Sequence, residues 1–185
     1  GRAGVTKPVL YYYFESKAGL FRAILDRAGQ MQEELLSGIL ESPGTALDRF
    51  LQIYRSIYQG MAEHPELFRL IHNLLFGPPD GIPSYDVMAF HRRMFGAVQR
   101  IYAEGVAGGE VIEAEPREVA MLVLGLMDFC FHHDQVLGAP PDPRRAERLL
   151  RLAFQGLAAT GAEQTGDRGP SWTEPGFEGW NDRTR

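Results

Sequence analysis

The N-terminal part of the chain groups several side chains that can donate hydrogen bonds to an anion. Residues 11–13 are three consecutive tyrosines, Thr6 and Lys7 precede them, and Lys17 follows. Hydroxyl and amine groups donate to phosphate oxygens, and aromatic rings pack against sugars and thymine methyl groups. The combination therefore predicts contact with a nucleic acid. The alternative is a local hydrophobic cluster capped by the tyrosines, with Lys17 as a solvated surface charge.

The charge distribution agrees with a nucleic-acid partner at one end only. The whole chain has a net charge of −5, which by itself is unfavourable for binding an anion. Residues 1–28, however, contain five basic side chains and only two acidic ones, so the remainder of the chain is strongly acidic. A small basic end on an acidic body is expected when that end alone meets an anionic partner.

A second group of side chains could line a pocket for a small molecule. Aromatic, methionine and histidine side chains recur at helical spacing through the middle of the chain, a typical pocket composition. The same residue types also describe an ordinary core, and His72 and His91 could each be a buried core histidine or a ligand contact. The candidates are Tyr54, Tyr58, Met61, Phe68, His72, Met88, His91, Phe95, Met127 and Phe131.

Other reactive side chains give weaker signals. His132, His133 and Asp134 suggest a metal site, but adjacent helical residues point about 100° apart and cannot chelate together, so we expect a solvated face and no metal. Asp128 interrupts an apolar helix and needs a partner, either an arginine across a dimer or a ligand donor. Cys130 is expected to be an inert core thiol.

No arrangement of residues predicts catalysis or a cofactor. The chain has no glycine-rich phosphate loop, no nucleophile elbow and a single cysteine. A helical hydrolase using His72 or His91 is a weak alternative, since no nucleophile–base spacing supports it. The single cysteine excludes an internal disulfide and favours a reducing, cytoplasmic setting.

The elements that must position these residues are helices. Apolar side chains follow helical periodicity almost throughout, and no hairpin signals occur, so the fold is predicted to be all-α. Pro8 lies in the first turn of the first helix, and Ser16 is placed to cap the second. Helices are expected over residues 6–14, 16–40, 47–61, from 65, 84–107, from 116, and 146–157, with loops at 77–83, 107–110 and 139–143.

The helix that begins at Pro116 predicts self-association. Between residues 119 and 131 its only strongly polar side chain is Asp128, and a helix that is apolar all round must be covered on all sides. The last helix also has apolar residues outside its main stripe, at Leu152 and Phe154. A homodimer built as a four-helix bundle would cover both helices, and a central core helix in a monomer is the alternative. The apolar run is shorter than the roughly 20 residues of a membrane span.

Residues 3–21, AGVTKPVLYYYFESKAGLF, resemble the turn and recognition helix of the tetracycline-repressor (TetR) family of helix-turn-helix regulators. The family pattern is roughly A-G-V-[ST]-x-x-x-[LI]-Y-x-[HY]-F-x-[SN]-K-x-x-L. The matching positions are Ala3, Gly4, Val5, Thr6, Leu10, Tyr11, Tyr13, Phe14, Ser16, Lys17 and Leu20.

This resemblance implies roles for individual residues, and the chain departs from the family pattern in two respects. Lys7, Pro8 and Tyr12 would approach base edges in the major groove, and Thr6, Tyr11, Tyr13 and Lys17 would hold phosphates. The family's first helix and most of its second would lie before Gly1, so the helix-turn-helix is partial. Tyr13 replaces the commoner histidine, and Gly19 is expected to weaken the first turn of the long helix.

The resemblance also implies a domain organisation and a function. Residues 1–40 would be the C-terminal part of the DNA-binding domain with its connecting helix, 41–160 a helical effector-binding and dimerisation domain, and 161–185 a polar tail. The expected function is a homodimeric repressor that leaves a pseudo-palindromic DNA operator when it binds a small, largely apolar or aromatic effector. The alternative is an all-α ligand-binding or dimerisation module that does not bind DNA in this form.

Overall fold

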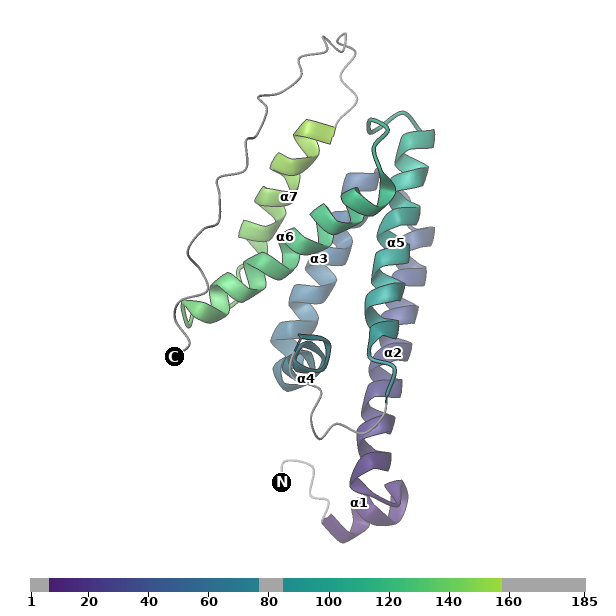
Figure 1. The fold of residues 1–185 in the computed structure, drawn as a ribbon, viewed down its shortest axis with the longest axis vertical. Helices are drawn as coiled ribbons and strands as arrows, with labels where there is room; N and C mark the ends of the chain where they lie inside the picture. Colours follow the sequence, from purple (N-terminus) through teal and green to yellow (C-terminus); the bar gives the residue numbers. More distant parts are fainter. Residues whose placement is uncertain (1–6, 77–84, 158–185) are drawn as a thin grey trace, which may run out of the picture.

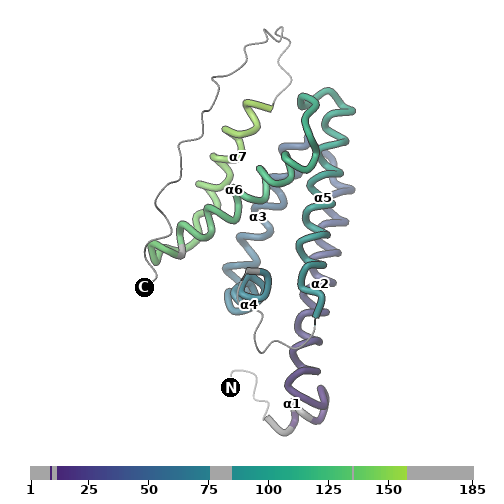
Figure 2. Tube along the Cα trace, in the orientation of Figure 1, coloured from purple at the N-terminus to yellow at the C-terminus, as the bar shows by residue number. Residues whose placement is uncertain are grey.

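The computed structural model describes residues 7–76 and 85–157, and these two ranges contain seven α-helices and no β-strand (Figures 1 and 2). The all-α prediction is therefore confirmed. The predicted loop at 77–83 and the tail at 161–185 lie outside the described residues. The helices are α1 (Lys7–Phe14), α2 (Lys17–Glu41), α3 (Ala46–Glu63), α4 (Pro65–Phe76), α5 (Met88–Ala107), α6 (Pro116–Val136) and α7 (Pro143–Leu157).

Capping side chains and prolines determine where the helices begin. Ser16 caps α2, as its position predicts, because its hydroxyl accepts a hydrogen bond from the Gly19 amide at 2.9 Å. Thr45 and Asp48 form a capping box at the start of α3. Three helices, α4, α6 and α7, begin at a proline, which lacks the amide hydrogen that the first turn would leave unpaired.

The long helices α2 and α5 run side by side in the same direction, and α3 runs antiparallel to them (Figure 1). Tyr85 donates to Asp26, and Arg93 donates to Gln32, so residue numbers in the two long helices rise together. Helices α6 and α7 pack against each other and cover α5 and α3, respectively, and α4 packs against α3. Helix α1 packs against the start of α2 at one end of the molecule.

One hydrophobic core joins α2, α3, α5, α6 and α7. Large side chains such as Phe50, Ile101 and Leu150 are completely buried in it. The hydroxyl of Tyr102 lies at its edge, where it donates to the Ile112 carbonyl at 2.9 Å and ties the segment before α6 to α5. None of the helices in the described ranges is long and apolar enough to cross a membrane.

Two expectations differ from the structure. The helix expected from residue 84 begins at Met88, because Tyr85 and Asp86 are non-helical and Ser84 lies outside the described residues. Asp134 does not belong to a solvated face. Its carboxylate is buried, accepts from the Asp142 amide at 2.9 Å and pairs with Arg145, so it fixes the turn between α6 and α7.

Candidate functional site

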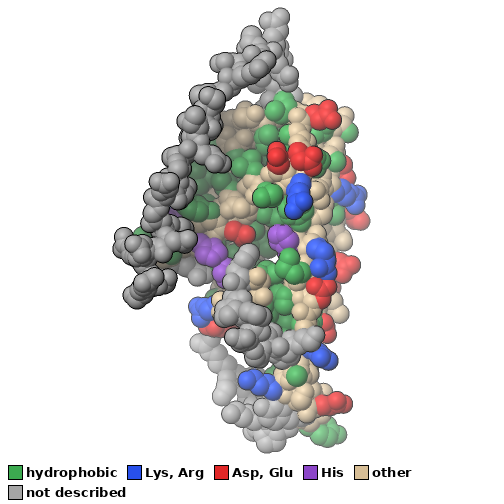
Figure 3. All heavy atoms as spheres, in the orientation of Figure 1, with side chains coloured by type: hydrophobic (Ala, Val, Ile, Leu, Met, Phe, Trp, Pro, Cys, Tyr) green, Lys and Arg blue, Asp and Glu red, His purple; other side chains and the backbone are tan. Residues whose placement is uncertain are grey.

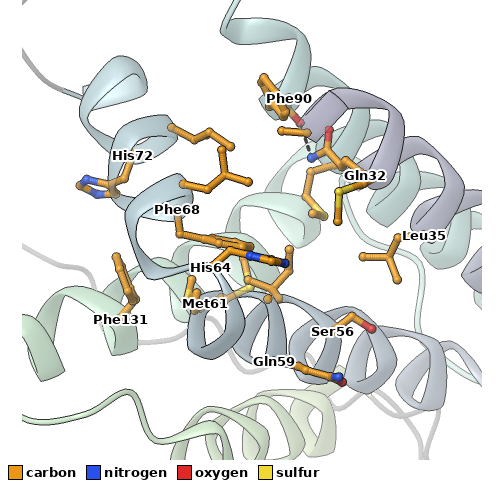
Figure 4. Close-up of a pocket in the computed structure, with 18 of the residues that line it drawn as sticks. Gln32, Leu35, Ser56, Gln59, Met61, His64, Phe68, His72, Phe90 and Phe131 are labelled. Carbon is orange, nitrogen blue, oxygen red and sulfur yellow. Dashed lines mark hydrogen bonds between the residues drawn. The ribbon is translucent and has the colours of Figure 1, made fainter. Parts of the chain in front are cut away.

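A cavity of about 420 Å³ lies among five helices in the middle of the molecule. Its volume is within the range of pockets that hold small organic molecules. Figure 4 shows the side chains that surround it, with Phe90 and Gln32 facing Phe68 and Met61 across the opening. The lining is predominantly apolar and comes from α2 (Ala28, Met31, Gln32, Leu35), α3 (Ser56, Ile57, Gln59, Gly60, Met61, Glu63), His64, α4 (Leu67, Phe68, Ile71, His72, Leu75), α5 (Phe90, His91, Met94) and α6 (Leu124, Met127, Asp128, Phe131).

A glycine in α3 sets the position of one aromatic wall. A Cβ placed on Gly60 would lie 2.9 Å from two atoms of the Phe68 ring. The missing side chain therefore lets α4 lay this ring directly on α3, where Figure 4 shows it between the cavity and the α3 backbone. Any larger residue at position 60 would push the ring elsewhere and change the shape of the cavity.

The opposite wall is held by polar contacts between α2 and α5. The side-chain amide of Gln32 donates to the Phe90 carbonyl at 3.1 Å and accepts from Arg93 at 3.0 Å. The Arg93 guanidinium also lies 5.1 Å from the centre of the Phe90 ring, a cation–π distance. Arg93 is thus occupied in positioning the wall and is not among the lining residues.

A pair of histidines joins α4 to α6 beside the cavity, and of the two only His72 lines it. His132 Nδ1 lies 2.9 Å from the Asp128 backbone carbonyl, and His132 Nε2 lies 2.9 Å from His72 Nε2. A carbonyl can only accept, so Nδ1 of His132 donates; in the neutral ring Nε2 then accepts, and His72 donates to it. Burial lowers the pKa of His72, and the neighbouring His132 lowers it further. Both effects favour a neutral imidazole.

Asp128 is half-buried beside this histidine pair. Its carboxylate forms no hydrogen bond or ion pair with any other residue that the structure describes. Burial raises the pKa of Asp128, and the nearby His132, His72 and His91 only partly oppose that shift. A carboxylate without a partner inside an apolar lining is unfavourable, so this group is suited to meeting a donor from a ligand.

The second candidate site is the junction between α1 and α2. Glu15 adopts the left-handed conformation, with φ of 59°, and the Ser16 amide donates to the Phe14 carbonyl at 2.6 Å. A Cβ placed on Gly19 would lie only 2.0 Å from that same Phe14 carbonyl oxygen. Gly19 was expected only to weaken the first turn of α2. The close approach of α1 instead requires a glycine at this position.

Two tyrosines of α1, Tyr12 and Tyr13, are exposed to solvent. The Tyr12 side chain is 82% exposed and the Tyr13 side chain 73%, and their rings meet edge to face with centres 5.5 Å apart. Phe14 is half-buried and lines a groove against α2, whereas Val9 is 43% exposed. Two large polar aromatic side chains in water at the end of a protein suggest a binding surface.

Among the remaining predicted contact residues, the structure describes the side chain of Lys17. Lys17 is the first residue of α2 and is exposed, where its charge and the positive end of the helix dipole both attract an anion. Lys7, Pro8 and Tyr11 belong to α1, and Thr6 lies outside the described residues.

A comparison with protein-family models gives a match that covers this junction. Residues 1–24 match the family model described as bacterial regulatory proteins, tetR family. This match covers 24 of the 185 residues and supports a tetR-family regulator. Proteins of this family are DNA-binding transcriptional regulators rather than enzymes. No significant match to a curated protein was found.

Six of the ten candidate effector residues line the cavity. They are Met61, Phe68, His72, His91, Met127 and Phe131. The other four do not line it. Tyr54 and Tyr58 are buried in the core, Met88 is exposed at the start of α5, and Phe95 packs half-buried against the core. His91 is exposed, so it is not a buried core histidine.

Sequence reasoning missed the part of the cavity formed by α2 and, apart from Met61, by the C-terminal half of α3. Met31 and Leu35 are spaced one turn apart on the long helix, which is the only signal that could have suggested them. Nothing in the sequence distinguishes Gln32, Gln59 or His64 from ordinary surface residues. Their position follows from how α4 folds back over α3.

Proposed function

We propose that this tetR-family protein is a cytoplasmic repressor that binds DNA as a homodimer and releases it when a small, largely apolar or aromatic molecule occupies the cavity. Residues 1–40 would serve DNA binding, and residues 41–160 effector binding and dimerisation. The observation that carries the proposal is the apolar cavity of about 420 Å³, which lies in the same chain as a helix-turn-helix segment.

At the DNA end, α1 would enter the major groove. Lys7, Pro8 and Tyr12 would meet base edges, while Thr6, Tyr11, Tyr13 and Lys17 would contact phosphates. The exposure of Tyr12, Tyr13 and Lys17 supports this assignment. Two copies of α1 would read two half-sites about one helical turn apart.

A shared set of side chains supports coupling between the cavity and α1. A groove of about 300 Å³ beneath the α1–α2 junction is lined by Phe14, Leu20 and Ile24, among others. Ala28, Met31 and Leu67 line both this groove and the larger cavity. A ligand that displaces α4 or the middle of α2 would therefore alter the support of α1. Occupation would lower DNA affinity to the extent that the ligand prefers the displaced conformer.

The exposed apolar side chains of α6 and α7 support a homodimer. Phe129 is 68% exposed, and Met121 and Leu152 are each 60% exposed. Side chains of this size are costly to leave in water together on neighbouring helices. Pairing α6 and α7 with the same helices of a second copy would cover them in a four-helix bundle.

The test is a DNA-binding measurement with the full-length product of the reading frame that encodes this chain. DNA sites are selected from a random library, and affinity is measured by fluorescence anisotropy at several salt concentrations. The proposal expects a two-fold symmetric site and an affinity that falls steeply with salt. Ligands that bind the cavity should then weaken DNA binding. A protein that binds such ligands but selects no DNA site would instead be a ligand-binding module.

A further inference from the structure

The charged groups around the cavity are all acidic. Glu63 and Asp128 are among its lining residues, whereas no lysine or arginine is, within the described ranges of the chain. Glu63 already accepts a hydrogen bond from the Gln59 side chain at 2.8 Å. Asp128 is the half-buried lining carboxylate for which the described residues supply no such partner.

The histidines beside Asp128 do not supply the missing positive charge. The bond between His72 and His132 needs an acceptor nitrogen, so at least one of the two rings must be neutral. Burial and the neighbouring ring lower the pKa of His72, which keeps this ring neutral near pH 7. His91 faces the same carboxylate from α5 but is exposed to solvent.

The aromatic side chains of the lining favour a cation as well. The Phe131 ring lies 5.8 Å from the His72 ring, measured between ring centres. Phe131 and Asp128 are three residues apart on α6, and both line the cavity. Phe68 and Phe90 form two further walls. Aromatic faces attract an ammonium group, and the attraction grows when water is excluded.

We propose that the ligand of this cavity is an apolar molecule with one protonated amine, and that Asp128 holds the ammonium group. This inference rests on the proposed function for the identity of the cavity as the effector site. It adds the chemical class of the effector. The apolar body of the ligand would lie against the methionine, leucine and phenylalanine side chains contributed by α2, α3 and α4.

Other ligand classes fit the lining less well. A carboxylate or phosphate ligand would stand beside Asp128 with no lysine or arginine in the lining to neutralise it, a like-charge contact in an apolar setting. A neutral alcohol could donate one hydrogen bond to Asp128, but it would leave the negative charge uncompensated. A protonated amine supplies the donor and the opposite charge together.

The experiment compares three probes of the same size, 4-phenylbutylamine, 4-phenylbutan-1-ol and 4-phenylbutyrate, by isothermal titration calorimetry at pH 7.5. Wild-type protein should bind the amine about tenfold or more tightly than the alcohol, and the acid most weakly. In Asp128→Asn the advantage of the amine over the alcohol should disappear. Glu63→Gln is the matched control, because that carboxylate lies in the same lining but is already hydrogen-bonded, and it should keep the advantage.

The wild-type comparison is decisive even if a variant folds poorly. Equal or tighter binding of the alcohol or the acid, or no binding of the amine, overturns the inference, as does an amine advantage that Asp128→Asn retains. DNA affinity measured with each probe separates this result from the proposed function. If the amine binds through Asp128 and DNA affinity does not change, the repressor proposal fails and the ligand class stands. If a neutral probe releases DNA and the amine has no advantage, the repressor proposal stands and the proposed ligand class fails.

Discussion

The α1–α2 junction and the helical body from α3 to α7 are stabilised in different ways. At the junction, α1 packs against α2, and the contact depends on a left-handed Glu15, a capping Ser16 and a glycine beneath a carbonyl. The body has a continuous core in which Phe50, Tyr54 and Ile53 are completely buried. Local backbone geometry therefore holds one region, and long-range packing holds the other.

This difference suggests why the two regions can serve different purposes. A body with a large core can leave a cavity unfilled, because the remaining buried surface outweighs the loss. A single short helix cannot fold by itself and must be oriented by its junction. A change at the junction should then affect DNA binding alone, whereas a change in the body should affect stability, assembly or ligand binding. The following predictions test that separation.

The largest effect is expected from Gly19→Ala. The new methyl group would lie 2.0 Å from the Phe14 carbonyl oxygen, so α1 must shift or unfold. If α1 is the recognition helix, DNA binding should fall toward its non-specific level, a loss of roughly a thousandfold. Thermal unfolding of the body, followed by circular dichroism, should change little, because the core includes none of the α1 side chains that the structure describes.

Gly38→Ala is the matched control for this substitution. Gly38 lies in the same helix, and a Cβ there would meet no atom within 4 Å. Alanine in a helix interior is favoured over glycine by about 0.5–1 kcal/mol, so this variant should be slightly more stable and bind DNA normally. Equal DNA affinities for the two variants would show that the junction does not orient a recognition surface.

A change in the body should act on DNA binding only through assembly. Phe129→Glu places a charge on the exposed apolar face of α6 without touching the cavity lining. We expect light scattering to give twice 20.7 kDa for the wild type and a mass near 20.7 kDa for the variant. Met88→Glu, which alters another exposed apolar residue on α5, should leave the dimer intact. A monomeric wild type would contradict the four-helix-bundle interface.

Two buried tyrosines of α3 give a smaller and sharper test of the body. The Tyr54 hydroxyl donates to the Val123 carbonyl, whereas the Tyr58 hydroxyl is buried without a hydrogen-bond partner among the described residues. Burial raises the pKa of both phenols, so both hydroxyls stay protonated. Tyr54→Phe should cost about 1 kcal/mol in urea unfolding, and Tyr58→Phe should be neutral or stabilising. Equal losses of stability in the two variants would indicate that the Tyr58 hydroxyl does form a hydrogen bond in the folded protein.

The fold could be predicted from the sequence because its signals are local. Ser16, Pro116 and Pro143 stand at helix starts, and helical periodicity between them needs no tertiary information. The geometry of the α1–α2 junction was harder to predict from the sequence. Gly19 looks like a weak helix residue until the path of α1 places a carbonyl over it. Residue type alone cannot show such a close approach.

The cavity could be predicted only in part, since core and pocket use the same residue types. Tyr54 and Met61 both lie on the apolar stripe of α3, yet the first is completely buried and the second lines the cavity. The deciding factor is the position of α4, which folds back over the C-terminal half of α3 and not over its start. Helical periodicity identifies an inward face but not whether the space it meets is filled.

The smallest predicted effect concerns pH and again belongs to the body. Burial and His132 lower the pKa of His72 below its ordinary value of 6.5 in the folded protein. The unfolded chain therefore takes up this proton first as the pH falls. The contribution of the neutral His72 ring to the free energy of unfolding is complete above pH 6.5. It is lost as the pH falls through the lower pKa of the folded state. One proton changes the free energy of unfolding by at most about 1.4 kcal/mol per pH unit.

Urea unfolding of the wild type and of His72→Asn at pH 8 and pH 5 measures this effect. The groups that face His72 are His132 and Asp128 from α6 and Asn73 from α4, and Asp128 opposes the shift. The wild type should lose more stability than the variant between the two pH values, while α1 and its junction, which contain no histidine, should not contribute. An equal loss in both proteins would mean that His72 is readily protonated in the folded state. The imidazolium would then neutralise Asp128, and the cavity would no longer favour a cationic ligand.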